Sequence, residues 1–257
     1  MSSGPWFSFL HKASNPRLRL ICLHYAGGNA GVFRHWGASI PQDIDLLAVN
    51  LPGRTSRFKE PLIEHMDLLV DRLLEAISRE RVLVQPQRFA LFGHSMGGLI
   101  AFELARKLGQ RMKLHPDHLI VSGSRAPSLP RKERLRHALP KAEFIAELRR
   151  YGGTPEAVFE HDELLETVVP MLRADFAIVE TYHPGSDAKV SCPLMVFGGE
   201  SDPYVESTLL DAWQEHTTAP IDVRLFAGGH FFLQDCEREV LGALSSILGR
   251  NATAMAV

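Results

Sequence analysis

The chain has 257 residues, of which 45% are hydrophobic, and its 28 Lys and Arg residues nearly balance 30 Asp and Glu residues, for a formal net charge of −2. This composition predicts a folded globular protein with a large core, and a chain of this length commonly forms one domain around one sheet. A near-neutral chain has no overall field that attracts a polyanion, so nucleic acid is not an expected partner.

Residues 1–16 (MSSGPWFSFLHKASNP) lack the basic segment and the long apolar run of a secretion signal. No apolar stretch of the sequence is long enough to span a bilayer. We therefore expect a cytoplasmic protein without a membrane anchor, and we expect it to be a monomer.

Short apolar runs alternate with longer segments of helical periodicity along the chain. An edge strand is expected at residues 6–11 (WFSFLH), and helices are expected at residues 68–80 (LLVDRLLEAISRE) and 96–108 (MGGLIAFELARKL). The other predicted strands are 17–23 (RLRLICL), 44–50 (IDLLAVN), 88–93 (RFALFG), 117–123 (DHLIVSG), 192–199 (CPLMVFGG) and 221–229 (IDVRLFAGG). This alternation predicts an α/β fold with a mainly parallel sheet covered by helices on both faces.

The alternation stops between residues 124 and 193, where no strand is predicted although a single crossover helix needs far fewer residues. A helix that ends on two glycines is predicted at residues 141–153 (KAEFIAELRRYGG). A second helix is predicted to follow, with Thr154 as its cap and Pro155 in its first turn. Residues 162–182 (DELLETVVPMLRADFAIVETY) predict one helix, or two that meet at a kink near a proline.

These helices predict an insertion above the sheet. We expect a single domain over residues 1–257 with a helical lid inserted at about residues 125–185. Because the lid interrupts the alternation and contains Gly152, Gly153 and Pro170, we expect it to be the mobile part of the molecule and the gate to its site.

Residues 93–97 (GHSMG) match the G-x-S-x-G pattern of a serine nucleophile. A predicted strand runs directly into the pattern and a predicted helix leaves it, which is the context that the pattern requires. Gly93 and Gly97 are small enough for the strand and the helix to approach each other. The alternative is a serine that only caps the helix, and the context favours Ser95 as the nucleophile.

A serine hydroxyl needs a base to take its proton, and the base needs a third group to hold its tautomer. Asp202 and His230 each come just after a predicted strand, as Ser95 does. All three then lie beyond the carboxyl ends of parallel strands, in the order Ser, Asp, His of α/β hydrolases. Glu200 and Asp187 compete for the role of the acid, and Asp202 is favoured because it follows its strand at loop distance.

Other histidines are expected to have ordinary structural places. His118 is predicted beside a turn at Pro116, and His161 and His216 are predicted at the surface. His230, which follows two glycines, has the position that a base requires.

The anionic intermediate of such a reaction needs hydrogen-bond donors. We expect these to be the backbone N–H of Met96, after the nucleophile, and that of Ala26, in the loop of residues 20–33 (LICLHYAGGNAGVF). Ala26, Gly28 and Gly31 in this loop form a degenerate version of the nucleotide-binding pattern G-x-G-x-x-G. However, the first glycine is missing, and the next strand ends at Asn50 without the acid that binds a ribose. No metal-binding motif is present, so neither a cofactor nor a metal is expected.

Taken together, these motifs resemble the type II thioesterases, which are stand-alone α/β hydrolases of nonribosomal peptide and polyketide synthesis. The resemblance covers nearly the whole chain, and the Gly-rich loop and the lid are more specific than G-x-S-x-G. The matching stretches are HYAGGNAGVFRHW, VNLPGRTSRFKEP, FGHSMGGLIAFELAR, MLRADFAIVETY, FGGESDPYV and GGHFFL.

The resemblance implies a serine thioesterase that hydrolyses acyl and aminoacyl thioesters on the phosphopantetheine arm of acyl or peptidyl carrier proteins, and so removes misloaded or stalled units. It implies that Ser95 is the nucleophile, Asp202 the acid and His230 the base, with phosphopantetheine belonging to the substrate. Thr55 and Ser201 stand where the family often has acids. Neither departure touches the expected chemistry.

Positive charge gathers in residues 130–141 (PRKERLRHALPK) and at Arg149 and Arg150 of the expected lid. Carrier proteins of these systems are typically acidic, so Arg131, Lys132, Arg134 and Arg136 are a candidate docking surface. The alternative is a solvated face without a partner.

Two other classes of function remain open from the sequence. One is a medium-chain acyl-carrier or acyl-CoA thioesterase, or a small-molecule esterase, on the same three residues, because a fold does not choose the acyl donor. The other is a non-catalytic interaction module, against which the presence of Ser95, Asp202 and His230 argues.

Overall fold

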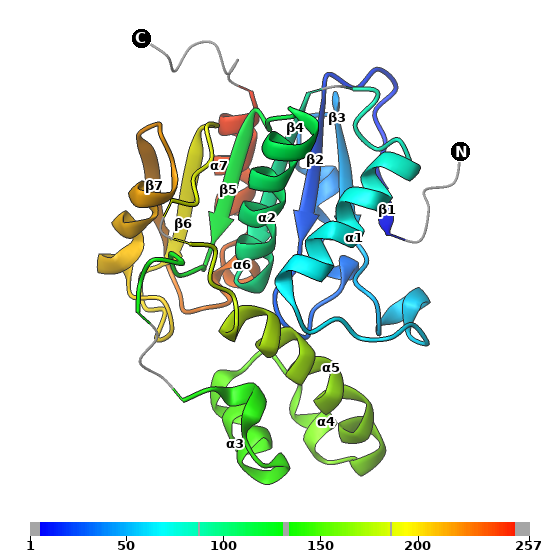
Figure 1. The fold of residues 1–257 in the computed structure, drawn as a ribbon, viewed down its shortest axis with the longest axis vertical. Coiled ribbons are helices and arrows are strands. Elements are labelled where there is room, and N and C mark those ends of the chain that lie inside the picture. Colours follow the sequence, from blue (N-terminus) through cyan, green and yellow to red (C-terminus); the bar gives the residue numbers. More distant parts are fainter. Residues whose placement is uncertain (1–5, 87, 131–133, 186, 250–257) are drawn as a thin grey trace.

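A seven-stranded sheet forms the centre of the molecule, in the order β1-β3-β2-β4-β5-β6-β7 (Figure 1). The computed structural model describes residues 6–86, 88–130, 134–185 and 187–249. The strands are β1 (Phe7–His11), β2 (Leu18–Leu23), β3 (Ile44–Val49), β4 (Phe89–His94), β5 (His118–Ser122), β6 (Leu194–Gly199) and β7 (Ile221–Phe226). The predicted strands are therefore confirmed, with ends that differ by at most three residues.

The direction of the strands brings the candidate residues to one edge of the sheet. β1 pairs with β3 in the antiparallel direction and forms the predicted edge, and every other pairing is parallel. Leu23 is in register with Gly93, and His94 is in register with Ser122. The loops that follow β2, β4 and β5 consequently start side by side at the carboxyl edge, where open α/β sheets bind their ligands.

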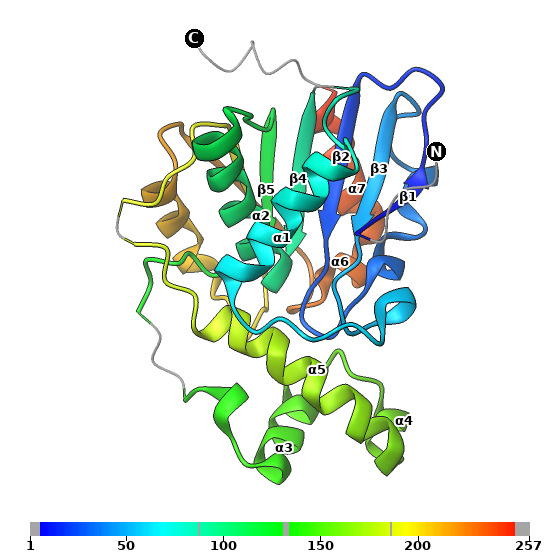
Figure 2. The same ribbon diagram turned by 45° about the vertical axis from the view of Figure 1, so that its right-hand side comes forward.

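Helices cover both faces of this sheet (Figures 1 and 2). Helices α1 (Met66–Arg79) and α2 (Met96–Lys107) pack on one face, and α6 (Phe232–Asp235) and α7 (Glu237–Leu248) pack on the other. Successive residues of a strand point to opposite faces. Leu91 therefore joins the apolar cluster under α1 and α2, whereas Phe92 joins the cluster under α7. The predicted α/β-hydrolase architecture is confirmed.

Shorter helical turns connect these elements. One is a single π turn, which extends α2 over Leu108–Met112. The 3₁₀ segments are Ala30–Phe33, Trp36–Ala38, Thr55–Arg57, Arg136–Ala138 and Ser207–His216. No helix within the described ranges is both long and apolar enough to cross a membrane.

Between β5 and β6 the chain forms the helical insertion, with α3 (Lys141–Tyr151), α4 (Glu156–Phe159) and α5 (Asp162–Glu180). These helices lie beyond the carboxyl edge of the sheet (Figure 2). They share an apolar cluster of their own, in which Phe144 of α3 packs against Phe176 of α5. Because α5 also contacts α2, the insertion rests directly on the body that carries Ser95.

Local details of the insertion differ from the prediction. Pro155 lies before α4 with an extended ψ of 139°, and no side chain caps this helix. The predicted cap at Thr154 is therefore wrong by one residue, because Pro155 does not enter the first turn. α5 is one helix that runs through Pro170, rather than two.

Two histidines are also placed differently from the prediction. His118 is the first residue of β5 and is buried. His216 is buried too, and its ring nitrogens contact the carbonyl oxygen of Ala188 and the N–H of Ser128. His216 is tolerated in the interior because both of its ring nitrogens have hydrogen-bond partners, which residue type and position in the sequence do not reveal.

Candidate active site

Ser95 occupies a strained turn between β4 and α2. Its backbone has φ 55° and ψ −117°, a conformation that residues with a side chain rarely adopt. A Cβ atom on Gly93 would lie 1.9 Å from the carbonyl oxygen of Gly97, and one on Gly97 would lie 2.1 Å from that of Leu23. The two glycines of the pattern are therefore required for the strand, the turn and the helix to pack.

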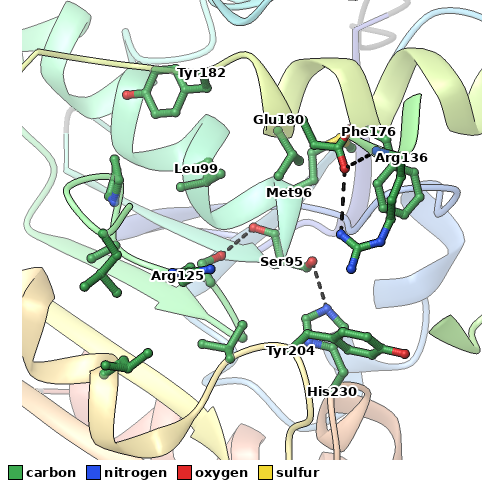
Figure 3. Close-up of a pocket in the computed structure, with 18 of the residues that line it drawn as sticks. Ser95, Met96, Leu99, Arg125, Arg136, Phe176, Glu180, Tyr182, Tyr204 and His230 are labelled. Carbon is green, nitrogen blue, oxygen red and sulfur yellow. Dashed lines mark hydrogen bonds and ion pairs between the residues drawn. The ribbon is translucent and has the colours of Figure 1, made fainter. Parts of the chain in front are cut away.

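Three side chains predicted from the sequence meet at this turn. Ser95 Oγ lies 2.9 Å from His230 Nε2 (Figure 3). His230 Nδ1 lies 2.8 Å from Asp202 Oδ2. The other oxygen of Asp202 accepts hydrogen bonds from the N–H groups of Tyr204 and Val205 at 2.8 and 3.1 Å. This chain of hydrogen bonds has the geometry that lets an imidazole take a proton from a serine hydroxyl.

The competing acids are not part of this arrangement. Glu200 and Asp187 are both exposed. Asp202 and His230 are both buried, which excludes water from the hydrogen bond between them. Glu200 begins the turn that precedes Asp202, so a single residue, Ser201, separates the exposed acid from the buried one.

His94, inside the G-x-S-x-G pattern, contacts the backbone of His230. Its Nε2 donates to the carbonyl oxygen of His230 and its Nδ1 accepts from Ser122 Oγ, each at 2.9 Å. Burial, together with the charge of His230, lowers the pKa of His94 to about 3. A neutral His94 keeps one donor and one acceptor nitrogen, and both are used. The sequence alone indicates no role for His94, because the G-x-S-x-G pattern accepts any residue at its position.

The two expected oxyanion donors lie on adjoining segments. Met96 is the first residue of α2 and lines the pocket next to Ser95. Ala26 lies in the loop after β2, and this loop meets the start of α2 where Gly97 packs against the carbonyl groups of Leu23 and His24. Ala26 is not among the residues that line the pocket, and its side chain packs against the cluster of the helical insertion.

Ser95 opens into a pocket of about 600 Å³ between the sheet and the helical insertion (Figure 3). Apolar walls come from Leu99 and Phe176, among others. Charged side chains also line it, and Arg136 lies 3.7 Å from both Glu180 and Glu147. The pocket is therefore partly polar, unlike a cavity shaped for hydrocarbon alone.

Tyr151, the last residue of α3, closes this pocket over the histidine. Its hydroxyl lies 3.1 Å from His230 Nε2, the atom that also contacts Ser95. Its ring stacks on that of Tyr204, with centroids 4.1 Å apart. Burial raises the pKa of the Tyr151 hydroxyl, so this group stays protonated and donates. The sequence alone does not indicate a role for Tyr151, because a tyrosine before two glycines indicates only the end of a helix.

The basic segment of the insertion divides into different environments. Arg131 and Lys132 lie outside the described residues. Arg134 is exposed and forms an ion pair with Glu143 at 2.8 Å. Arg136 instead lines the pocket, so it does not belong to an outer docking surface. In the part of the chain that the structure describes, no group of three His, Cys, Asp or Glu residues is placed to hold a metal ion.

Comparison with known proteins identifies the family of the chain. Residues 18–248 match the model of the thioesterase domain family. The chain is 40% identical to thioesterase PikA5 of Streptomyces venezuelae, over 96% of this chain and 87% of that protein. It is 33% identical to the human medium-chain S-acyl fatty acid synthase thioesterase, over 91% of this chain and 88% of that protein.

A solved structure gives the same result. The type II thioesterase BorB from the borrelidin biosynthetic cluster superposes with a TM-score of 0.84 and 37% identity, covering 96% of this chain and 99% of that one. Its fold and sequence agree over almost the full length of both proteins, which confirms the resemblance inferred from the motifs. The chain therefore belongs to the thioesterase domain family and is a thioester hydrolase with an α/β-hydrolase fold.

Proposed function

We propose that the protein is a serine thioesterase that removes acyl and aminoacyl groups from the phosphopantetheine arm of carrier proteins in nonribosomal peptide or polyketide synthesis. The observation that carries the proposal is the hydrogen-bonded series Ser95, His230 and Asp202 at the base of a partly polar pocket. The similarity to a type II thioesterase from a biosynthetic cluster supports the class of substrate. We also propose that it acts in the cytoplasm, where such carrier proteins are made and loaded.

In the proposed mechanism, Ser95 Oγ attacks the carbonyl carbon of the thioester while His230 Nε2 accepts the hydroxyl proton. Asp202 holds Nδ1–H and stabilises the imidazolium. The N–H groups of Met96 and Ala26 bind the developing oxyanion. The intermediate collapses with release of the pantetheine thiolate, which takes the proton from His230. Water, which gives a proton to the same Nε2, then attacks the acyl-serine ester. The bond to Ser95 Oγ breaks, Oγ takes the proton back from His230, and the carboxylic acid is released.

The walls of the pocket favour short or polar acyl groups over saturated chains. Arg136, Glu147 and Glu180 all border the space beside Ser95. An alkyl chain laid against these groups would strip them of water without replacing its hydrogen bonds, which is unfavourable. Aminoacyl groups and small acyl groups keep water or polar partners there. The medium-chain fatty acyl alternative is therefore the weaker one.

Mass spectrometry of loaded carrier proteins tests this proposal. Carrier proteins bearing acetyl, aminoacyl or octanoyl groups are incubated with the enzyme, alongside acyl-CoA thioesters and oxoesters of the same acids. We expect fastest release of acetyl and aminoacyl groups from the carrier proteins, and no release by Ser95→Ala. Fluorophosphonate should label the wild type at Ser95. Near wild-type turnover by Ser95→Ala would rule out the covalent mechanism, and faster octanoyl release would favour the fatty acyl alternative.

A second experiment tests carrier docking on the basic segment. Changing Arg131, Lys132 and Arg134 to glutamate should raise the KM for acyl-carrier substrates and leave a free acyl-pantetheine thioester unaffected. Added salt should weaken the wild type on carrier substrates alone. Arg72→Glu is a control for reversal of one charge, because Arg72, like Arg134, is an exposed, ion-paired arginine. Equal effects of the two variants would place the docking surface elsewhere.

A further inference from the structure

A buried ion pair joins three segments that are far apart in the sequence. Arg54 follows β3, and its Nη1 and Nη2 donate to Oδ2 and Oδ1 of Asp175, in α5, at 2.8 Å each. The two side chains are only 7% and 1% exposed. Such a two-pronged contact fixes both groups in orientation as well as in distance.

The third segment is the loop of residues 25–28, which we call the oxyanion loop. The N–H of Gly27 donates to Asp175 Oδ2 at 2.8 Å, and Arg54 Nη1 also donates to the carbonyl oxygen of Gly28 at 3.2 Å. Gly27 has φ 78°, and a Cβ on it would lie 2.6 Å from a methyl group of Leu172, also in α5. The loop is thus held against α5 by charge, by hydrogen bonds and by close packing.

Ala26 stands directly before the peptide group that Asp175 binds. The turn that contains it is closed by a hydrogen bond from Gly28 N–H to the carbonyl oxygen of Tyr25 at 3.0 Å. The orientation of the Ala26 backbone therefore depends on the positions of Gly27 and Gly28. An oxyanion donor acts because it is oriented before charge develops, and a displacement of about 1 Å can cost about 100-fold in rate.

We propose that Arg54 and Asp175 are positioning residues, which hold the oxyanion loop so that the N–H of Ala26 faces the reacting carbonyl group. The inference rests on the proposed function, in which Ala26 is a donor. It also assigns a second task to α5, because the helix that walls the pocket anchors the catalytic loop as well. The second half of α5 is then tied to the oxyanion loop, whereas α3 and α4 take no part in these contacts.

The chain contains a matched ion pair away from the site. Arg19 contacts Asp45 at 2.6 Å, with side chains 8% and 2% exposed, and Asp45 also accepts a backbone hydrogen bond, from Ala13 at 3.0 Å. Both residues belong to strands, near the edge of the sheet opposite Ser95. Loss of either acid leaves a buried arginine without its partner, so both losses should lower stability alike.

The test compares Asp175→Asn with Asp45→Asn on a free acyl-pantetheine thioester. Both variants should lower the Tm, by about 10 °C. Asp175→Asn should also lower kcat about 10- to 100-fold and change KM less than about threefold, because it displaces a donor used in the transition state. Fluorophosphonate labelling of Ser95 should slow by a similar factor, since its phosphoryl oxygen needs the same donors. Asp45→Asn should keep kcat and labelling near the wild type, at temperatures where it is folded.

Equal kcat values for the two variants would overturn the inference and leave Arg54 and Asp175 as a purely stabilising pair. If Asp175→Asn does not fold, Arg54→Lys replaces it, because a lysine keeps the charge but cannot donate to both carboxylate oxygens and to Gly28 together. It should lower kcat with little change in KM, and an unchanged kcat would again overturn the inference. Turnover by Ser95→Ala would instead refute the proposed function, so the two failures are distinguishable.

Discussion

Removal of a single hydroxyl, in Tyr151→Phe, is expected to make Ser95 more reactive. His230 Nε2 is approached by Ser95 Oγ at 2.9 Å and by the Tyr151 hydroxyl at 3.1 Å. A neutral imidazole has only one acceptor lone pair, so the two hydroxyl groups compete for it. The phenylalanine ring keeps the stacking on Tyr204, so the variant should fold as the wild type does.

The size of the effect follows from this competition. A net hydrogen bond between neutral groups contributes about 0.5–1.5 kcal/mol, which corresponds to about a 2- to 10-fold change in rate. Because the two distances to His230 Nε2 are nearly equal, we expect an increase in rate near the middle of this range, about 5-fold. The second-order rate constant for fluorophosphonate labelling of Ser95 measures it, since a small reagent needs no docking.

Tyr204→Phe is the control, because its hydroxyl donates to the carbonyl oxygen of Arg150 and not to His230. It should label at the wild-type rate. Slower labelling of Tyr151→Phe than of both other proteins would refute the competition and make the Tyr151 hydroxyl an aid to the nucleophile.

The remaining predictions concern the acid and the pH dependence of folding. Asp202→Asn should lower kcat about 10³- to 10⁴-fold through loss of the Nδ1–H tautomer, whereas Glu200→Gln should leave it nearly unchanged; the reverse order would reassign the acid. Burial lowers the pKa of His24 to about 4 and that of His94 to about 3, below the unfolded value of about 6.5. The unfolded chain therefore takes up these protons first, and stability present above pH 6.5 is lost as the pH falls toward 4. From pH 7 to pH 5, the two histidines together should lower the free energy of unfolding, measured with urea, by about 4 kcal/mol. A decrease below about 1 kcal/mol would contradict their burial as neutral groups.

Local patterns in the sequence were sufficient to predict the strands of the sheet and the turn that carries Ser95. Alternating apolar runs and helical periodicity are properties of consecutive residues, so they predict strands and helices without knowledge of what packs on them. The G-x-S-x-G turn is equally local, since Gly93 and Gly97 are needed by the backbone on either side of Ser95. In a parallel sheet, the residues that follow successive strands lie at the same edge. This rule predicts that Asp202 and His230 lie at the same edge as Ser95.

The contacts that shape the site across the sequence were decided by the tertiary structure alone. Asp175 reaches Gly27 over 148 positions and Arg54 over 121, and Tyr151 reaches His230 over 79. No periodicity links such residues, because each contact depends on how the helical insertion packs onto the carboxyl edge of the sheet. The inward turn of Arg136 has the same origin: the pattern marked a charged segment, and only packing of that segment against α5 decided which of its arginines faces the pocket and which faces water.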